Sequence, residues 1–415
     1  MNQTRFWAPI SVLVISVALL VGLVWGNYRF DRSKVASGGF TIQWTSIRAL
    51  AKSGTSPYDE RNSAEIQATG LSEAAFIWGS RPEYTSPLYS GLVIFPVTLA
   101  SDETFAHAIW LTIQLILIFG IIIITSKLAS WKPAWHSFML FSLFTVFSYH
   151  VAQPWIDGGL SIWSAFFLLV ALTSINANRY EVGGVFLALA TVQPQMIILP
   201  LVFVLVWAIS KRRSLLILWF FITLILLTVI GLFLVPDWII QYVRLLYNFS
   251  GNFPQGSPGV FFSNLLPGLG KQLGWVISGL CVLVLLIEWF LALRRDYRWF
   301  LWTVCLTMVV SIWIGIPVIP GNLVGLIIPL ILVSALLTER WPRGGPWVAT
   351  FMAIVLFGWE WALVYLDVTK PQPFQLLNLI FPLPAVLIIG LYWVRWWAAK
   401  PKRLLIEELR LGETH

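Results

Sequence analysis

Acidic and basic side chains are concentrated in one early stretch, residues 27–104, of an otherwise apolar chain. A carboxylate in such a stretch can accept a proton from a hydroxyl group, and a nearby cation can stabilise a developing negative charge. Its acids are Asp31, Asp59, Glu60, Glu65, Glu73, Glu83, Asp102 and Glu103. The cations near them include Arg48, Lys52 and Arg81. This stretch is therefore where we first expect general acid–base chemistry.

Three aspartates are candidates for a catalytic base, and each also has a structural explanation. Asp31 stands close to two arginines after the first apolar run, where it can equally be a solvated interfacial charge. Asp59 follows a Ser-Pro pair and also fits a helix-capping box. Asp157 lies outside the early stretch, before two glycines at the mouth of an apolar run, where helix capping is the alternative.

Other polar residues are candidates for binding a substrate. Gln193 and Gln195 flank a proline between two apolar segments, and amides at that depth are expected to face a cavity or bond another helix. Arg244 adjoins a second polar loop, residues 236–271, and can meet a phosphate or extend to the membrane interface. Glu83 stands shortly before a proline-containing segment near the expected membrane surface.

The elements that must position these side chains are apolar helices. The chain has 415 residues, of which 58% are hydrophobic and 11% charged, and runs long enough to cross a bilayer recur throughout. We predict a single all-α membrane domain over residues 1–415 with about twelve transmembrane helices. The expected spans are 7–26, 105–126, 134–151, 158–176, 182–193, 195–210, 214–235, 272–293, 299–317, 323–338, 346–365 and 375–395.

The net charge of +8 comes from short basic clusters between these spans, a pattern that sets orientation and does not indicate a nucleic-acid partner. Placing the clusters in the cytoplasm puts both termini and the tail, residues 396–415, on that side. Residues 27–104 and 236–271 are then extracytoplasmic. This arrangement requires Pro87–Ala100 not to cross the membrane. In the alternative arrangement that segment crosses and residues 182–210 form one span.

The early stretch is predicted to fold as a helical cap. Phe40, Trp44 and Ile47 share one helical face, which is typical of an amphipathic helix on a membrane surface. Gly54 is expected to end this helix, and Ser56 to begin a second one. No His, Asp or Glu grouping has the spacing of metal ligands. Binding of a divalent ion by the acids of this loop is an alternative that the sequence does not exclude.

Several short motifs carry a resemblance to a known family over about residues 30–215. They are Phe40–Leu50 with Gly54 and Pro57-Tyr58-Asp59, Pro87-Leu88-Tyr89 with Phe95-Pro96, and Gln193-Pro194-Gln195 with Lys211-Arg212-Arg213. In order and spacing these resemble the polyprenol-phosphate-sugar-dependent glycosyltransferases of family 87, which are GT-C-type enzymes related to mycobacterial mannosyltransferases. The family usually has an aspartate directly before the phenylalanine, as the presumed base, and this chain has Gly39 there.

The resemblance implies a GT-C-like fold and an enzyme of the cell envelope. It implies transfer of a mannose-like hexose from a polyprenyl phosphate to a lipid, glycan or protein acceptor on the extracytoplasmic face. Asp31, Asp59 or Asp157 would replace the missing aspartate. The implied substrate contacts are Trp44, Arg48, Tyr58, Glu83, Gln193, Gln195 and Arg244. Two alternatives are a non-catalytic protein that binds lipid-linked glycans, which Gly39 favours, and a transporter of lipid-linked sugars.

Overall fold

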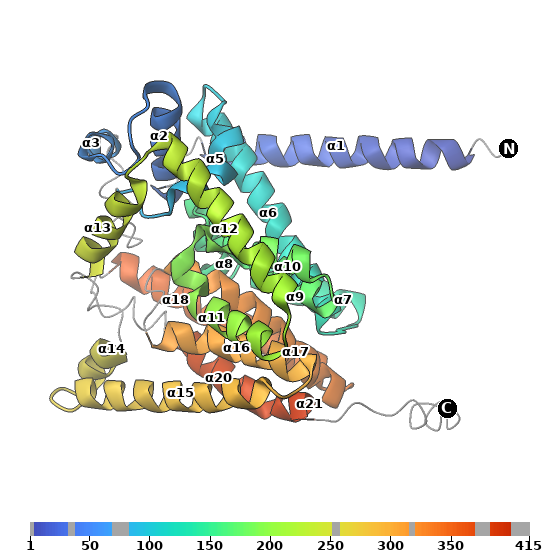
Figure 1. Ribbon diagram of the computed structural model, residues 1–415. Helices are drawn as coiled ribbons and strands as arrows, with labels where there is room; N and C mark the ends of the chain where they lie inside the picture. The colour runs from blue at the N-terminus through green and yellow to red at the C-terminus, as the bar shows by residue number, and fades with distance from the viewer. Residues whose placement is uncertain are drawn as a thin grey trace.

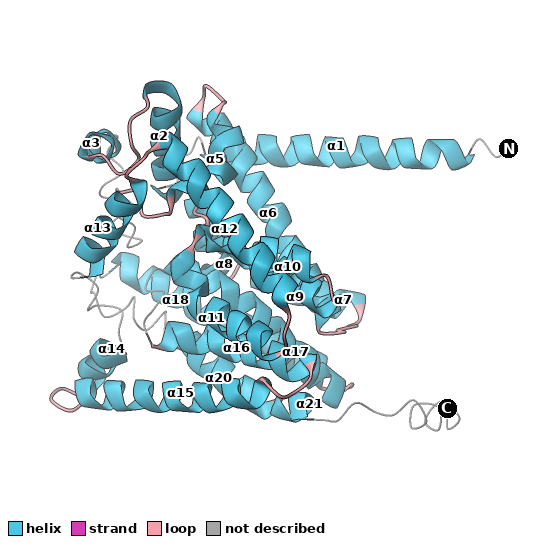
Figure 2. Cartoon of the chain, viewed as in Figure 1, coloured by secondary structure: helices cyan, strands magenta, loops and turns pink. Residues whose placement is uncertain are grey.

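A computed structural model of the protein describes residues 4–31, 38–68, 83–250, 258–314, 320–369 and 382–399. Every regular element in these ranges is a helix, as the all-α prediction requires (Figure 2). The first half comprises α1 (Thr4–Asp31), α2 (Gly38–Ser53), α3 (Glu60–Ala68), η1 (Leu88–Ser90), α5 (Gly91–Thr98), α6 (Glu103–Leu128), α7 (Trp135–Val146), α8 (Tyr149–Asp157) and α9 (Ser161–Asn176).

The second half of the chain continues the helical bundle. It comprises α10 (Tyr180–Leu189), η2 (Ala190–Val192), α11 (Pro194–Ser210), α12 (Ser214–Leu234), α13 (Trp238–Ser250), α14 (Pro258–Leu265), α15 (Gly270–Ala292), α16 (Tyr297–Trp313), η4 (Pro320–Leu326), α17 (Ile327–Arg340), α18 (Gly345–Thr369), α20 (Pro382–Trp393) and α21 (Arg395–Ala399).

Five described helices are long and apolar enough to cross a bilayer: α6, α12, α15, the continuous segment Gly321–Arg340, and α18. A sixth span is obtained if α8 and α9, which are bent by 114° at their junction, are counted together. The protein is therefore a multi-pass membrane protein, but the expected number of about twelve spans is wrong for the described residues.

Burial within protein explains the overcount. The helix α16 has only 17 residues, and nearly all of them are buried against other helices. A helix that is surrounded by other helices is apolar on every face because it contacts their side chains. Its composition therefore resembles that of a membrane span, although it can be shorter than a span. The shorter apolar helices α7, α10, α11 and α20 were counted as spans for the same compositional reason.

Two local predictions agree with the observed helices. Residues 182–210 form a pair of helices, α10 and α11, which η2 and Gln193 connect where the turn was expected. The proline-containing segment after residue 87 folds as η1 and α5, and Leu88–Thr98 is a short apolar helix below the length of a span.

At the crossing of α10 with α12, a side chain at Gly184 would meet the backbone of Phe220 at 2.8 Å, so glycine allows this close approach.

The helix α2 is buried by protein to a greater extent than the sequence predicts for an amphipathic helix on a membrane surface. Phe40 and Trp44 are buried, but so are Thr41 and Gln43 from outside the expected apolar face. The first half of α2 is therefore inserted among protein elements. Gly54 ends the helix as expected, with a φ of 67° and its N–H donating to Leu50 O.

The cap and the second polar loop meet at one end of the bundle, where Figure 1 shows α2, α3 and α13. The hydroxyl of Ser56 donates to Gln241 Oε1 at 2.6 Å, and the rings of Tyr58 and Tyr242 are 6.1 Å apart. The sequence predicts a polar loop over residues 236–271. This is partly wrong, since α13 extends to Ser250 and α14 begins at Pro258.

Candidate active site

A partly buried hydrogen bond joins the start of α2 to the end of α8. The backbone N–H of Gly39 donates to Asp157 Oδ1 at 2.9 Å. Gly158 follows with a φ of 74°, a left-handed conformation that ends α8. The bend into α9 is held from α6, because the indole of Trp110 donates to Gly158 O and the amide of Gln114 donates to Gly159 O, both at 2.7 Å. Contacts from α2 and α6 thus hold the end of α8 that carries the Asp157 carboxylate.

The Asp157 carboxylate occupies the space beside residue 39 that a side chain would need. A Cβ atom built on Gly39 would overlap Asp157 Oδ2 and would lie 2.8 Å from Asp157 Cγ. Any residue other than glycine at position 39 therefore displaces the carboxylate. The two positions compete for one volume, which can hold an acidic group from either side of the contact.

Electrostatics make this carboxyl group suitable for proton transfer. Asp157 lies at the bend between α8 and α9, neither of which alone is long enough to cross a bilayer, and the residue keeps partial solvent exposure. Burial of the carboxyl group raises the pKa of Asp157 to about 6, against the lowering effects of the Gly39 N–H and of His107. A carboxylate with this pKa is ionised at neutral pH and a stronger base than an ordinary aspartate.

Asn322 of η4 links polar side chains near the α8–α9 junction, where Ser161 follows Asp157 by four residues. Asn322 Oδ1 accepts a hydrogen bond from Ser161 Oγ at 2.8 Å and from Gln193 Nε2 at 3.3 Å. Gln153 is four residues before Asp157 on α8, so both side chains lie on the same face of that helix. We call Gln153, Ser161, Gln193, Gln195 and Asn322 the amide cluster.

The amide cluster retains unused hydrogen-bonding capacity. Gln153 Oε1, Gln195 Oε1 and Asn322 Nδ2 are buried and have no hydrogen-bond partner among the described residues. A buried amide group without a partner costs free energy, so native proteins seldom leave one unused. Unpaired amide acceptors and donors near a carboxylate are suited to bind the hydroxyl groups of a polyhydroxylated ligand.

Tyrosines line the neighbouring part of the cap. Tyr58 donates to Ser86 O at 2.7 Å, and its ring lies 5.5 Å from that of Tyr84. Tyr89 forms a hydroxyl–hydroxyl hydrogen bond of 2.8 Å with Thr191. Burial raises the pKa of Tyr58, Tyr84 and Tyr89, so these phenols are neutral hydrogen-bonding groups.

The acids of the early stretch are used mainly in local structure. Asp59 Oδ1 accepts from the N–H of Arg61 at 2.9 Å and so caps α3, a role that the sequence predicted for Ser56. Asp102 caps α6, and Glu103 accepts a hydrogen bond from Thr41 at 2.6 Å. Asp31 is the last residue of α1, and its side chain lies outside the described residues.

The predicted binding residues are only partly brought together. Arg48 donates to Ser101 O at 3.1 Å, and its guanidinium is 4.4 Å from the centroid of the Trp44 ring. Nine residues of α2 separate Arg48 from Gly39, about 14 Å along the helix axis, so Arg48 is remote from Asp157. Glu83 is half-buried beside Tyr84, and Arg244 is exposed on α13.

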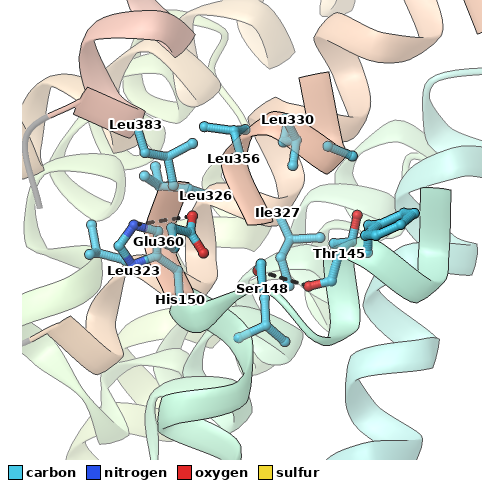
Figure 3. Close-up of a pocket in the computed structure, with 13 residues that line it drawn as sticks. Thr145, Ser148, His150, Leu323, Leu326, Ile327, Leu330, Leu356, Glu360 and Leu383 are labelled. Atoms are coloured by element: carbon cyan, nitrogen blue, oxygen red, sulfur yellow. Dashed lines mark hydrogen bonds and ion pairs between the residues drawn. The ribbon is translucent and has the colours of Figure 1, made fainter. Parts of the chain in front are cut away.

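A second ionisable pair lies at the far end of α8 (Figure 3). His150 Nε2 is 3.5 Å from Glu360 Oε1, in a pocket whose other walls are mainly leucine and isoleucine from η4, α17, α18 and α20. Seven residues of α8 separate His150 from Asp157, about 10 Å along its axis. This pair connects α8 with α18 and does not belong to the Asp157 site.

Sequence reasoning missed several residues of the site. His107, whose ring lies 4.6 Å from that of Phe40, is isolated in the sequence, as is Asn322. A lone polar residue at the start of an apolar segment is a weak signal for either. No three His, Cys, Asp or Glu side chains of the described residues are grouped as metal ligands would be.

The fold and this site define a multi-pass membrane protein with a partly buried carboxylate near a polar cluster. A model of glycosyltransferase family 87 matches residues 84–314, more than half of the 415-residue chain. The protein therefore belongs to glycosyltransferase family 87, which implies a transferase with a sugar donor and an acceptor. The matched range contains Asp157 and Gln193, whereas α2 and Asn322 lie outside it. Comparisons with curated proteins and with solved structures find no match.

Proposed function

We propose that this glycosyltransferase moves a mannose-like hexose from a polyprenyl-phosphate donor to a lipid, glycan or protein acceptor. The reaction takes place on the extracytoplasmic face of the cell membrane, within a GT-C-like fold whose two termini are cytoplasmic. Membership of family 87 supports the transferase activity. The donor, the sugar and the orientation rest on the motif resemblance and on the basic clusters between helices.

The contact between Gly39 and Asp157 is the single observation that carries the assignment of a base. The family resemblance places an acid at position 39, and the Asp157 carboxylate lies where that side chain would begin. Asp157 is thus the replacement among the three candidates. Asp59 is already engaged in capping α3, which makes it the weaker candidate.

The proposed reaction follows from this placement. Asp157 accepts the proton of the acceptor hydroxyl as its oxygen attacks the anomeric carbon of the donor sugar. The bond from that carbon to the phosphate oxygen breaks, and the polyprenyl phosphate leaves with the electron pair. One carboxylate and a direct displacement give inversion at the anomeric carbon. The acceptor hydroxyl must therefore approach within hydrogen-bonding distance of Asp157.

The remaining candidates take supporting roles in this proposal. Gln193 and Gln195, with their neighbours in the amide cluster, bind hydroxyl groups of the sugar. Tyr58, Trp44 and Glu83 contact substrate at the edge of the cap. Arg48 and Arg244 meet phosphate or acceptor groups farther out, because the 14 Å offset along α2 keeps Arg48 from the reacting atoms.

The test uses the purified full-length protein with radiolabelled polyprenyl-phosphate mannose and extracted membrane lipids as acceptors. We expect label to pass from the donor to an acceptor. Donor binding without transfer would favour the non-catalytic alternative. In sealed vesicles, label that crosses the membrane without transfer would favour a lipid-linked sugar transporter.

A further inference from the structure

A large polar cavity lies at the end of the bundle opposite to the cap. Its volume is about 760 Å³, and its walls come from the α6–α7 turn, the start of α16, the end of α17, the start of α18 and α21. Figure 1 shows α7 and α21 at the end of the molecule away from α2, α3 and α13. The cavity is therefore separate from the Asp157 site.

The charged groups around this cavity favour an anion. Lys132 and Arg298 line it, against one lining acid, Glu339. The guanidinium of Arg298 lies 5.4 Å from the ring centroid of Trp397, which also lines the cavity, so the aromatic ring positions the cation. Asp296 directly precedes the wall residue Tyr297 in the sequence but does not itself line the cavity, and its side chain is exposed.

Three helices begin at the cavity, and backbone N–H groups at such ends favour negative charge. The wall includes Ala134, which precedes α7, Tyr297, the first residue of α16, and Pro346 near the start of α18. The residues before α7 and α16, Ala134 and Asp296, make no side-chain hydrogen bond to their helices. Backbone N–H groups at a helix start without a side-chain cap can donate to a bound anion.

A buried donor in the same wall provides an independent indication of a ligand. Trp131 is 8% exposed, and its indole Nε1 has no hydrogen-bond partner among the described residues. The turn that presents it is fixed, because the N–H of Trp131 donates to Ser126 O at 2.8 Å and Ser130 adopts a φ of 55°. The Trp131 ring packs against Phe138 and Phe141, with centroid distances of 5.9 and 4.9 Å, so its unused donor is held in the wall that also contains the two cations. Such a combination is suited to an oxyanion.

We propose that this cavity binds the phosphate-bearing headgroup of an anionic phospholipid. Lys132, Arg298 and the indole of Trp131 bind the phosphate oxygens. The acyl chains lie along the ends of the spanning helices α6 and α18, which begin or end at the cavity. Tryptophan and tyrosine in the wall are typical of headgroup depth, and this favours a lipid over a free anion. The bound lipid would connect the α6–α7 turn to α16 and α17.

The experiment measures thermal unfolding of the full-length protein in detergent during titration with short-chain phosphatidylglycerol. Phosphatidylcholine and inorganic phosphate are titrated in parallel. We expect phosphatidylglycerol to raise the midpoint temperature, and the other two to have little effect. Lys132→Ala/Arg298→Ala should weaken the apparent affinity by about tenfold or more. The matched control is Arg212→Ala/Arg343→Ala, which removes two exposed cations from outside the cavity wall and should leave the affinity unchanged.

A conservative variant guards against a folding defect. Trp131→Phe keeps an aromatic ring and removes the donor, so it should weaken phosphatidylglycerol binding while the midpoint without lipid stays close to that of the wild type. Equal weakening by the control pair would overturn the proposal in favour of general surface attraction. An equal response to inorganic phosphate would overturn the lipid assignment. None of these outcomes depends on glycosyl transfer, so the proposed function is tested separately.

Discussion

The backbone N–H of Gly39 donates a hydrogen bond of 2.9 Å to the carboxylate of Asp157, across 118 positions of the chain. The contact places an acidic group from α8 in the volume next to the first turn of α2. Position 39 is where the family resemblance expects an acid. In the proposed mechanism, Asp157 supplies this acid from the opposite side of the same contact.

Substitution of Gly39 tests the competition for this volume. Gly39→Ala should lower transfer by about tenfold or more, because its Cβ displaces the Asp157 carboxylate. The exchange variant Gly39→Asp/Asp157→Gly should transfer faster than Asp157→Gly alone, since it returns an acid to the same volume. Initial transfer rates of the four chains provide the measurement. If Gly39→Ala has the wild-type rate, the two side chains do not compete.

The pH dependence of transfer should reflect the raised pKa of Asp157, about 6. The reaction needs the ionised carboxylate, which is lost as pH falls through this pKa. We expect kcat/KM to be level above about pH 7 and to fall about tenfold for each pH unit below about 6. A rate that stays constant down to pH 4.5 would show that the base is another group.

Removal of an amide should affect substrate binding more than the chemical step. Asn322→Ala leaves Ser161 and Gln193 without their shared acceptor. We expect KM for the donor to rise by about tenfold, with a smaller change in kcat. Gln241→Ala, which loses hydrogen bonds to Ser56 of the cap and to Asp237 but none in the amide cluster, is the control. Equal effects of both variants would indicate a general packing defect.

A partly buried ion pair should contribute to stability without affecting the chemistry. Arg395 binds Glu288 through two hydrogen bonds of 3.0 and 3.2 Å, which join α21 to α15. Arg395→Met should lower the free energy of unfolding by about 3 kcal/mol, because it leaves a buried carboxylate without its partner. The double variant Glu288→Met/Arg395→Met should recover most of that loss. Thermal unfolding in detergent measures both, and a single variant as stable as the wild type would contradict the expectation.

The sequence was sufficient for the helical class, the α10–α11 turn at Gln193 and the helix that Gly54 ends, because these depend on local composition and on glycine or proline geometry. The number of spans could not be obtained in this way. Apolar composition does not distinguish lipid contact from burial by neighbouring helices, as α16 demonstrates.

The site was less accessible to sequence reasoning. Asp157 was one of three candidates, and its contact with Gly39 joins positions 118 residues apart that no local pattern connects. Asn322 and Gln193 are 129 positions apart, and their contact depends on tertiary packing alone. Arg48 was expected to contact the substrate, but nine residues of α2, about 14 Å along its axis, separate it from Gly39.

The most direct test of the central claim is the transfer rate of Asp157→Asn with radiolabelled polyprenyl-phosphate mannose. Asn keeps an oxygen to accept the Gly39 N–H but cannot take a proton, so the rate should fall by about 10²–10⁴-fold while donor binding in the same sample is unchanged. Asp59→Asn, the matched control at the α3 cap, should retain most of the activity. Transfer by Asp157→Asn within a few-fold of the wild-type rate would contradict the assignment of Asp157 as the base.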